Sequence, residues 1–345
     1  MADPVLAVSG LRTEFRTQHG TVPVVEDVSF ALGRRETLGI VGESGCGKSI
    51  TARSIMRLVE FEHGRIAAGS IRYMDASGAV TEIAALPHRS ARMRAIRGAE
   101  IAMIFQEPMA SFNPVFTVGA QMTEMLRYHL TLSRREARER AIEMLDRVRV
   151  PNPARRIDEH PHEFSGGMRQ RAMIAMAISC GPRLLIADEP TTALDVTVEA
   201  QVLDLLHGLK ERDGMSTIVI THDMAVISEM SDAVMVMYAG WRVEHGSVAQ
   251  VLDDPLHPYT RGLLRSIPRI GSREELYSIE GSVPNPLRPP RGCRFAPRCP
   301  DAMPHCHEIV PPDFAPEEGR RVRCWLYGDP GDAGAPSRPP APARL

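Results

Sequence analysis

Gly42-Glu43-Ser44-Gly45-Cys46-Gly47-Lys48-Ser49 follows the apolar run 37–41 and precedes a segment with helical periodicity at 50–58. It fits the pattern G-x-x-x-x-G-K-[ST]. The glycines allow successive backbone N–H groups to point at a β-phosphate, and the start of the helix adds partial positive charge. Lys48 can neutralise β and γ oxygens, and Ser49 can ligate magnesium. An ordinary glycine-rich turn is the alternative, but the flanking strand and helix favour a phosphate-binding loop.

Composition is typical of a large globular protein. The chain has 345 residues, of which 43% are hydrophobic, enough for one large domain and a smaller appendage. Its 41 basic and 43 acidic residues leave a net charge of −2, which argues against a general nucleic-acid surface. No apolar run approaches the roughly 18 to 20 residues of a membrane helix, and no secretion signal is evident. We expect a cytosolic chain whose six cysteines are reduced or metal-bound.

Strands and helices alternate over the first two thirds of the chain. The expected strands are two within 22–41 joined at Gly33, then 101–105, 184–187 and 216–220, and the expected helices are 50–58, 121–150, 168–179 and 198–209. This alternation predicts an α/β domain with a mostly parallel sheet and a ligand site beyond the carboxyl ends of its strands. After about Glu244 proline, arginine and cysteine become frequent, which predicts a domain boundary.

A second strand carries carboxylates that complement the phosphate loop. The strand 184–187 would deliver Asp188 beside the magnesium site, and the adjacent Glu189 could polarise a water molecule for in-line attack. An Asp-Glu pair after a strand is otherwise a solvated strand end or a helix cap. Together with the phosphate loop upstream, the pair favours nucleotide hydrolysis over those roles.

Phe164-Ser165-Gly166-Gly167-Met168 resembles the signature of the ABC ATPase family, whose usual sequence is Leu-Ser-Gly-Gly-Gln. Gln106 resembles the Q-loop glutamine, Ala193-Leu194-Asp195 the D-loop, and His222 the switch histidine of that family. The resemblance implies a P-loop NTPase fold: an ABC nucleotide-binding domain at 1–245, with a RecA-like core and a helical subdomain at about 107–181. Phe164 and Met168 depart from the usual signature, but the central Ser-Gly-Gly is intact, so we expect phosphate binding to survive.

The same resemblance implies roles for these residues. Two such domains would stack head to tail, so that Ser165 and the N–H groups of the two glycines grip the γ-phosphate of ATP held by the opposing subunit. The implied catalytic residues are Glu189, His222 and Gln106. Phe15 aligns with the aromatic residue that stacks on adenine, or else belongs to the core. The implied ATP-binding residues are Phe15, Gly42, Glu43, Ser44, Gly45, Cys46, Gly47, Lys48, Ser49, Ile50, Ser165, Gly166, Gly167 and Asp195, with Ser49, Gln106 and Asp188 on Mg2+.

Within the family, the chain resembles the ATPase subunits of oligopeptide and dipeptide importers. The stretches that carry this resemblance are 104–109, 113–119, 162–171, 257–260 and the cysteine-rich region within 246–327. It is most similar to the first, or D-type, of the two unlike ATPases of such importers. This implies a heterodimer with a second ATPase subunit, two transmembrane permease subunits and an extracytoplasmic solute-binding protein, at the cytoplasmic face of the inner membrane. Related nickel and glutathione importers share these features, so the solute stays open.

Four cysteines mark the C-terminal region, with the spacing Cys293-x5-Cys299-x6-Cys306-x17-Cys324. Four thiols suit either a [4Fe-4S] cluster or tetrahedral zinc, and a bound metal would stabilise a region with little apolar content. The spacing lacks the C-x2-C of common zinc sites, and the family resemblance favours iron–sulfur; free thiols are the third alternative. Cys46 and Cys180 are interpreted as ordinary small residues. The final residues, 328–345, are rich in Gly, Pro and Ala and are expected to form a disordered tail.

Two other classes of function compete with a peptide importer. One is a soluble ABC-type ATPase of nucleic-acid repair or translation, although such proteins usually carry a long coiled coil or two tandem cassettes, and this sequence has neither. The other is a module that binds ATP without turnover, which Glu189 argues against. ATP-driven import without a nucleic-acid partner is therefore the favoured function.

Overall fold

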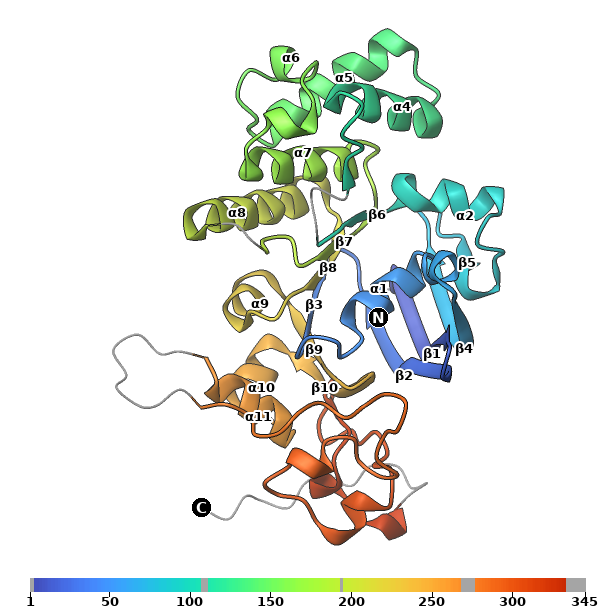
Figure 1. Ribbon diagram of the computed structural model, residues 1–345, viewed down its shortest axis with the longest axis vertical. Helices are drawn as coiled ribbons and strands as arrows, with labels where there is room; N and C mark the ends of the chain where they lie inside the picture. The colour runs from blue at the N-terminus through green and yellow to red at the C-terminus, as the bar shows by residue number, and fades with distance from the viewer. Residues whose placement is uncertain (1–2, 107–110, 193–194, 268–276, 333–345) are drawn as a thin grey trace. The chain divides into compact units, whose positions relative to one another are not determined.

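The computed structural model describes residues 3–106, 111–192, 195–267 and 277–332. Two compact units make up the chain, and Figure 1 labels their elements. The first contains Met1–Ala7, Ala31–Thr37 and Arg72–Ile220. The second contains Val8–Phe30, Leu38–Ile71 and Thr221–Leu345. Residues 107–110 and 193–194, which include parts of the importer motif and of the D-loop, lie outside the described residues.

The first unit contains three parallel strands in the order β8-β7-β6. Their bounds are β6 (Ile101–Ile104), β7 (Leu184–Asp188) and β8 (Ser216–Ile220). Every residue of these strands is buried, as expected of continuous apolar runs in a parallel sheet. Ile101 pairs with Leu184, and Leu184 with Ser216, so the carboxyl ends of the strands lie at one edge. The strands predicted at these positions are confirmed.

Helices make up most of the remainder of the first unit (Figure 1). They are α2 (Ala91–Ala95), α4 (Val118–Leu130), α5 (Arg134–Arg147), α6 (Pro153–Arg156), α7 (Gly166–Ile178) and α8 (Val196–Asp213), and the short strand β5 (Val80–Glu82) pairs with the end of β4 (Gly64–Met74). Helix α4 packs on α5, α5 on α7, and α7 on β6. The prediction of one helical segment over 121–150 is wrong, because two helices, α4 and α5, occupy this stretch. Thr131, with a positive φ of 56°, ends α4, and Ser133 then caps α5 in a reciprocal capping box with Glu136.

The second unit contains two groups of strands. One has the order β2-β1-β4, and the other has the order β11-β10-β9-β3. Their bounds are β1 (Leu6–Thr17), β2 (Gly20–Leu32), β3 (Thr37–Val41), β9 (Ala233–Tyr238), β10 (Trp241–Ser247) and β11 (Arg321–Val322). Strand β3 is parallel to β9, whereas β10 is antiparallel to both β9 and β11. Strands β2 and β3 were predicted from their apolar runs, but β1, β9, β10 and β11 were not.

Four helices of the second unit pack around these strands. They are α1 (Lys48–Ile55), α9 (Met224–Met230), α10 (Val248–Asp253) and α11 (Pro258–Arg265). Helix α9 approaches β3 so closely that a Cβ on Gly39 would lie 2.6 Å from the Ile227 side chain. The core around them includes Tyr238, Tyr259 and Phe295, so the C-terminal extension shares a hydrophobic core with the strands.

The C-terminal extension, 277–332, consists mainly of turns. Its regular elements are β11 and the 3-10 turns Ala296–Arg298, Pro304–His307, Trp325–Tyr327 and Pro330–Asp332. A small second core forms from Ala296, Cys306, Phe314, Val322, Cys324 and Trp325. Three arginines that each adjoin a cysteine form ion pairs with acids outside the extension: Arg294 with Glu26, Arg298 with Glu43, and Arg323 with Asp27. The domain boundaries stay a prediction, and residues 333–345 lie outside the described residues.

Candidate nucleotide site

The phosphate loop lies between β3 and α1, as the sequence predicts. Gly42 leaves β3 with a φ of 154°, and a Cβ there would lie 2.1 Å from the carbonyl oxygen of Met237. Gly47 has a φ of 102° and is the N-cap of α1, where a Cβ would lie 3.0 Å from the carbonyl oxygen of Val24. These two glycines are therefore required by close backbone packing as well as by their φ angles.

Lys48 is buried at the first position of α1. Its Nζ donates hydrogen bonds to the carbonyl oxygens of Gly42 at 2.7 Å and Glu43 at 3.1 Å. The loop thus encloses an ammonium group that donates to neutral carbonyl oxygens, and a phosphate oxygen could replace them with a stronger, charge-assisted bond. Ser49 is half-buried at the next position. Burial raises the pKa of Cys46, which stays a neutral thiol that fills space beside Gly42.

Two further predicted residues meet at the end of β7. Asp188 is buried as the last residue of the strand, and Glu189 follows with a φ of 48°, which is uncommon for a residue with a side chain. The Glu189 carboxylate accepts hydrogen bonds from Gln106 Nε2 at 2.8 Å and Thr192 Oγ1 at 2.9 Å. The structure therefore brings Gln106 and Glu189 together and fixes the orientation of the carboxylate. Thr192 was not predicted as part of the site.

The signature residues form the start of α7. Phe164 is buried, whereas Ser165 and Gly166 are exposed, and the Ser165 hydroxyl accepts a hydrogen bond from the Met168 N–H at 3.3 Å. A Cβ on Gly166 would meet no atom within 4 Å. The positive end of a helix of 13 residues is thus accessible to an anion.

The other predicted residues are positioned by adjacent elements. His222 is exposed and follows β8, and Asp195 is the exposed N-cap of α8, where it accepts a hydrogen bond from the Val198 N–H. Phe15 is half-buried on β1, and its ring lies near Gly64. The roles of these three residues stay predictions.

Two residues beside the phosphate loop were missed by sequence reasoning. The Glu43 N–H donates a hydrogen bond to the buried Tyr259 hydroxyl at 2.8 Å. The Glu43 carboxylate accepts two hydrogen bonds from Arg298. Both partners are more than 200 positions away in the sequence, and neither lies in a motif that indicates phosphate binding.

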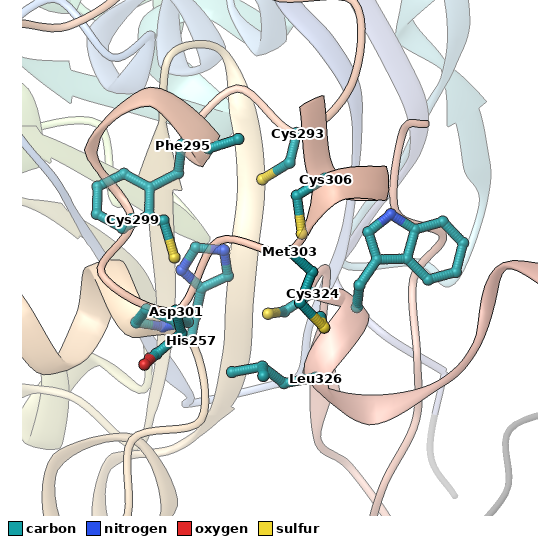
Figure 2. Close-up of a pocket in the computed structure, with 12 residues that line it drawn as sticks. His257, Cys293, Phe295, Cys299, Asp301, Met303, Cys306, Cys324 and Leu326 are labelled. Carbon is teal, nitrogen blue, oxygen red and sulfur yellow. The ribbon is translucent and has the colours of Figure 1, made fainter. Parts of the chain in front are cut away.

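The four C-terminal cysteines surround one small pocket (Figure 2), which His257, Phe295 and Asp301 also line. Burial raises the pKa of Cys293, that of Cys299 to about 11 and that of Cys324 to about 12, so these thiols are neutral near pH 7. Within the described ranges, no group of three or more His, Cys, Asp or Glu side chains has the arrangement of a metal site. The structure therefore gathers the predicted ligands without supporting the predicted iron–sulfur or zinc site.

None of the helices in the described parts of the chain combines the length and apolar character needed to cross a bilayer.

Family models match two parts of the chain. The ABC transporter model matches residues 25–192, and the model of the oligopeptide/dipeptide transporter C-terminal region matches residues 243–306. Two relatives, from Brucella abortus strain 2308 and Brucella ovis, are provisionally named as peptide import ATP-binding proteins. The first is 52% identical over 323 residues, covering 93% of this chain and 94% of the relative. The second is 50% identical over 328 residues, covering 93% and 96%.

Solved structures agree on the fold. A dimeric ATP-binding cassette in a post-hydrolysis state, bound to ADP and Pi, has a TM-score of 0.61 at 24% identity, covering 70% of this chain and 98% of that chain. A component of an ABC transporter complex from Clostridium perfringens has a TM-score of 0.57 at 24% identity, covering 73% and 92%. The predicted nucleotide-binding fold is therefore confirmed, and the extent and identity of the match to the curated relatives show that the chain belongs to the ABC transporter family, as one of its ATP-binding subunits.

Proposed function

We propose that this protein hydrolyses ATP to power the import of peptides through an ABC transporter. The observation that carries the proposal is the Lys48 ammonium, buried at the start of α1 and bonded to carbonyl oxygens of its own glycine-rich loop. The names of its curated relatives support peptides as the solute class. Nickel, glutathione or another small solute is the alternative within the same machinery.

In the proposed reaction, Lys48 binds β and γ oxygens of ATP, and Ser49, Asp188 and Gln106 would hold Mg2+, which would neutralise charge on the phosphates. Glu189 acts as the general base that takes a proton from the attacking water. Its hydrogen bond from Gln106 supports this role, because the bond orients the carboxylate without protonating it. His222 contacts the γ-phosphate.

ATP would close a pair of cassettes. The exposed start of α7, with Ser165 and Gly166, supports a contact with the γ-phosphate bound by an opposing subunit. We propose that this subunit is a second, unlike ATPase, and that the pair docks at the cytoplasmic face of the inner membrane on two permeases served by an extracytoplasmic solute-binding protein.

The test is peptide uptake by vesicles that contain the whole transporter. Uptake of a radiolabelled dipeptide should require ATP inside a right-side-out vesicle and should be lost when Lys48→Ala replaces the native subunit. Uptake of nickel or glutathione without peptide uptake would move the assignment to the alternative solutes. Co-purification with ribosomes or DNA in place of permeases would favour a soluble ATPase of translation or repair.

We also propose that Cys293, Cys299, Cys306 and Cys324 hold a metal, with a [4Fe-4S] cluster favoured over zinc. The support is their convergence on one pocket, although the described side chains do not form a metal-ligating group. Protein purified without oxygen should contain about four iron atoms per chain if the cluster is present, or about one zinc atom and no iron if zinc is bound. Metal-free protein with four titratable thiols would refute both assignments.

A further inference from the structure

Glu43, the second residue of the phosphate loop, forms hydrogen bonds through its carbonyl, its N–H and its carboxylate. Its carbonyl accepts a hydrogen bond from Lys48 Nζ at 3.1 Å, and its N–H donates to Tyr259 of α11 at 2.8 Å. Its carboxylate accepts bonds of 2.8 and 3.1 Å from the two terminal nitrogens of Arg298. Glu43 thus connects the lysine of the loop directly to a guanidinium of the C-terminal extension.

Arg298 is fixed as firmly as its partner. Its side chain is 6% exposed. Besides the two bonds to Glu43, its guanidinium donates to the hydroxyl of Tyr238 and to the backbone carbonyls of Ile279 and Glu280, at 3.3, 3.1 and 2.9 Å. These five bonds use all five N–H groups of a rigid planar fork, so the direction in which Arg298 meets Glu43 is set by the extension.

The turn that carries Arg298, Ala296–Arg298, lies between two of the cysteines that line the pocket in Figure 2. Phe295, the residue before the turn, packs against Tyr238 and Tyr259 with ring centroids 5.1 and 5.4 Å apart. The extension therefore reaches the phosphate loop by a charged pair and by a packed aromatic cluster.

We propose that Arg298 is a positioning residue for nucleotide binding. It holds Glu43, and with it the segment that carries Lys48, in the conformation that receives the triphosphate, and it neutralises a carboxylate that would otherwise repel the phosphates. This proposal rests on the ATP-binding function proposed above. It gives the C-terminal extension a direct part in the nucleotide site.

The test measures ATP affinity of the full chain by calorimetry without Mg2+, so that no turnover occurs. Arg298→Ala should raise the dissociation constant roughly tenfold, because it leaves a partly buried carboxylate without its cation. The double variant Arg298→Ala, Glu43→Gln should recover affinity to within about threefold of the native chain, because the repelling charge is gone. A general loss of structure would not be reversed by a second substitution.

Arg323→Ala is the matched control. Arg323 is another buried arginine of the extension, 7% exposed and adjacent to Cys324, but its ion pair is with Asp27 on β2. The Arg323→Ala substitution should lower the melting temperature and leave ATP affinity unchanged. Arg298→Lys keeps the positive charge but loses the planar guanidinium, so it should bind ATP with intermediate affinity. This variant replaces Arg298→Ala in the test if the alanine variant does not fold.

Several outcomes would overturn the proposal. They are native ATP affinity in Arg298→Ala, no recovery in the double variant, or an equal loss of affinity in Arg323→Ala. Failure of the proposed function is distinguishable, because then the native chain itself would not bind ATP, or would bind it as well after Lys48→Ala.

Discussion

Replacement of Glu189 by glutamine tests whether this side chain, at the end of β7, is the general base or only a structural residue. Two hydrogen bonds that hold the carboxylate, from Gln106 and Thr192, go to the same oxygen, Oε2. The carbonyl oxygen of a glutamine side chain can take that position, while its amino group replaces the other oxygen. We therefore expect Glu189→Gln to keep the fold and ATP affinity but to lose the general base. Turnover should fall by about 10²- to 10⁴-fold, or about 3 to 5 kcal/mol in activation free energy.

Glu189→Ala is the comparison variant. This variant loses the hydrogen bonds from Gln106 and Thr192, so its free energy of unfolding should fall by about 1 to 2 kcal/mol in addition to the loss of turnover. The assay is phosphate release by the assembled transporter at saturating ATP, with ATP binding and thermal melting measured on the same preparations. If Glu189→Gln retains more than a tenth of native turnover, the carboxylate is not the base. If it loses ATP binding, the geometry around Gln106 has been misinterpreted.

Three other changes test separate parts of the structure. Gly42→Ala would set a Cβ 2.1 Å from the Met237 carbonyl oxygen, so the phosphate loop must shift, and calorimetry should show ATP affinity reduced by at least roughly tenfold. Ser165→Ala removes the N-cap of α7, so it should lower the free energy of unfolding by about 1 kcal/mol and should also abolish ATP-induced pairing of subunits. Ser133→Ala removes the N-cap of α5 and should lower stability by a similar amount but leave pairing intact. Light scattering measures the pairing in both variants. Burial, with a smaller effect from Arg242, lowers the pKa of His245 to about 4. The unfolded chain therefore takes up this proton first as pH falls below about 6.5, so His245 should account for about 1 kcal/mol of the stability lost by pH 5.5, and urea unfolding of His245→Gln should show a loss smaller by that amount. Burial also lowers the pKa of His257, to about 3, which adds a loss of the same sign that His245→Gln leaves in place.

Local sequence predicted the parts of the site that depend on local geometry. The loop at 42–49 dictates its own conformation, because Gly42 and Gly47 have φ angles and close contacts that a side chain would oppose. The buried strands β6, β7 and β8 were predicted because continuous apolar runs need cover on both faces. The break between α4 and α5 was missed, although Ser133 and Glu136 have the spacing of a capping box.

Long-range pairs could not be predicted in this way. Tyr259 and Arg298 contact Glu43 across 216 and 255 positions, and no spacing or motif around either residue links it to the phosphate loop. The same holds for β11, which has two residues and is defined by its pairing with β10 and by a bridge from Val322 to Phe314. Such contacts depend on the complete fold and leave no periodicity in the sequence.

Arg294, Arg298 and Arg323, the arginines beside the cysteines, make truncation of the chain after residue 245 damaging. A recombinant cassette ending there would lose β11 from the edge of β10 and would lose the arginines that pair with three acids, Glu26, Asp27 and Glu43. Of these acids, Glu26 keeps an ion pair with Arg12 at 3.6 Å. Two of those arginines also cover the indole of Trp241, at 4.3 and 5.2 Å from its centroid, which truncation would expose to solvent. Biochemical work on an excised cassette would therefore measure a damaged protein, and expression vectors should carry the chain at least through Tyr327.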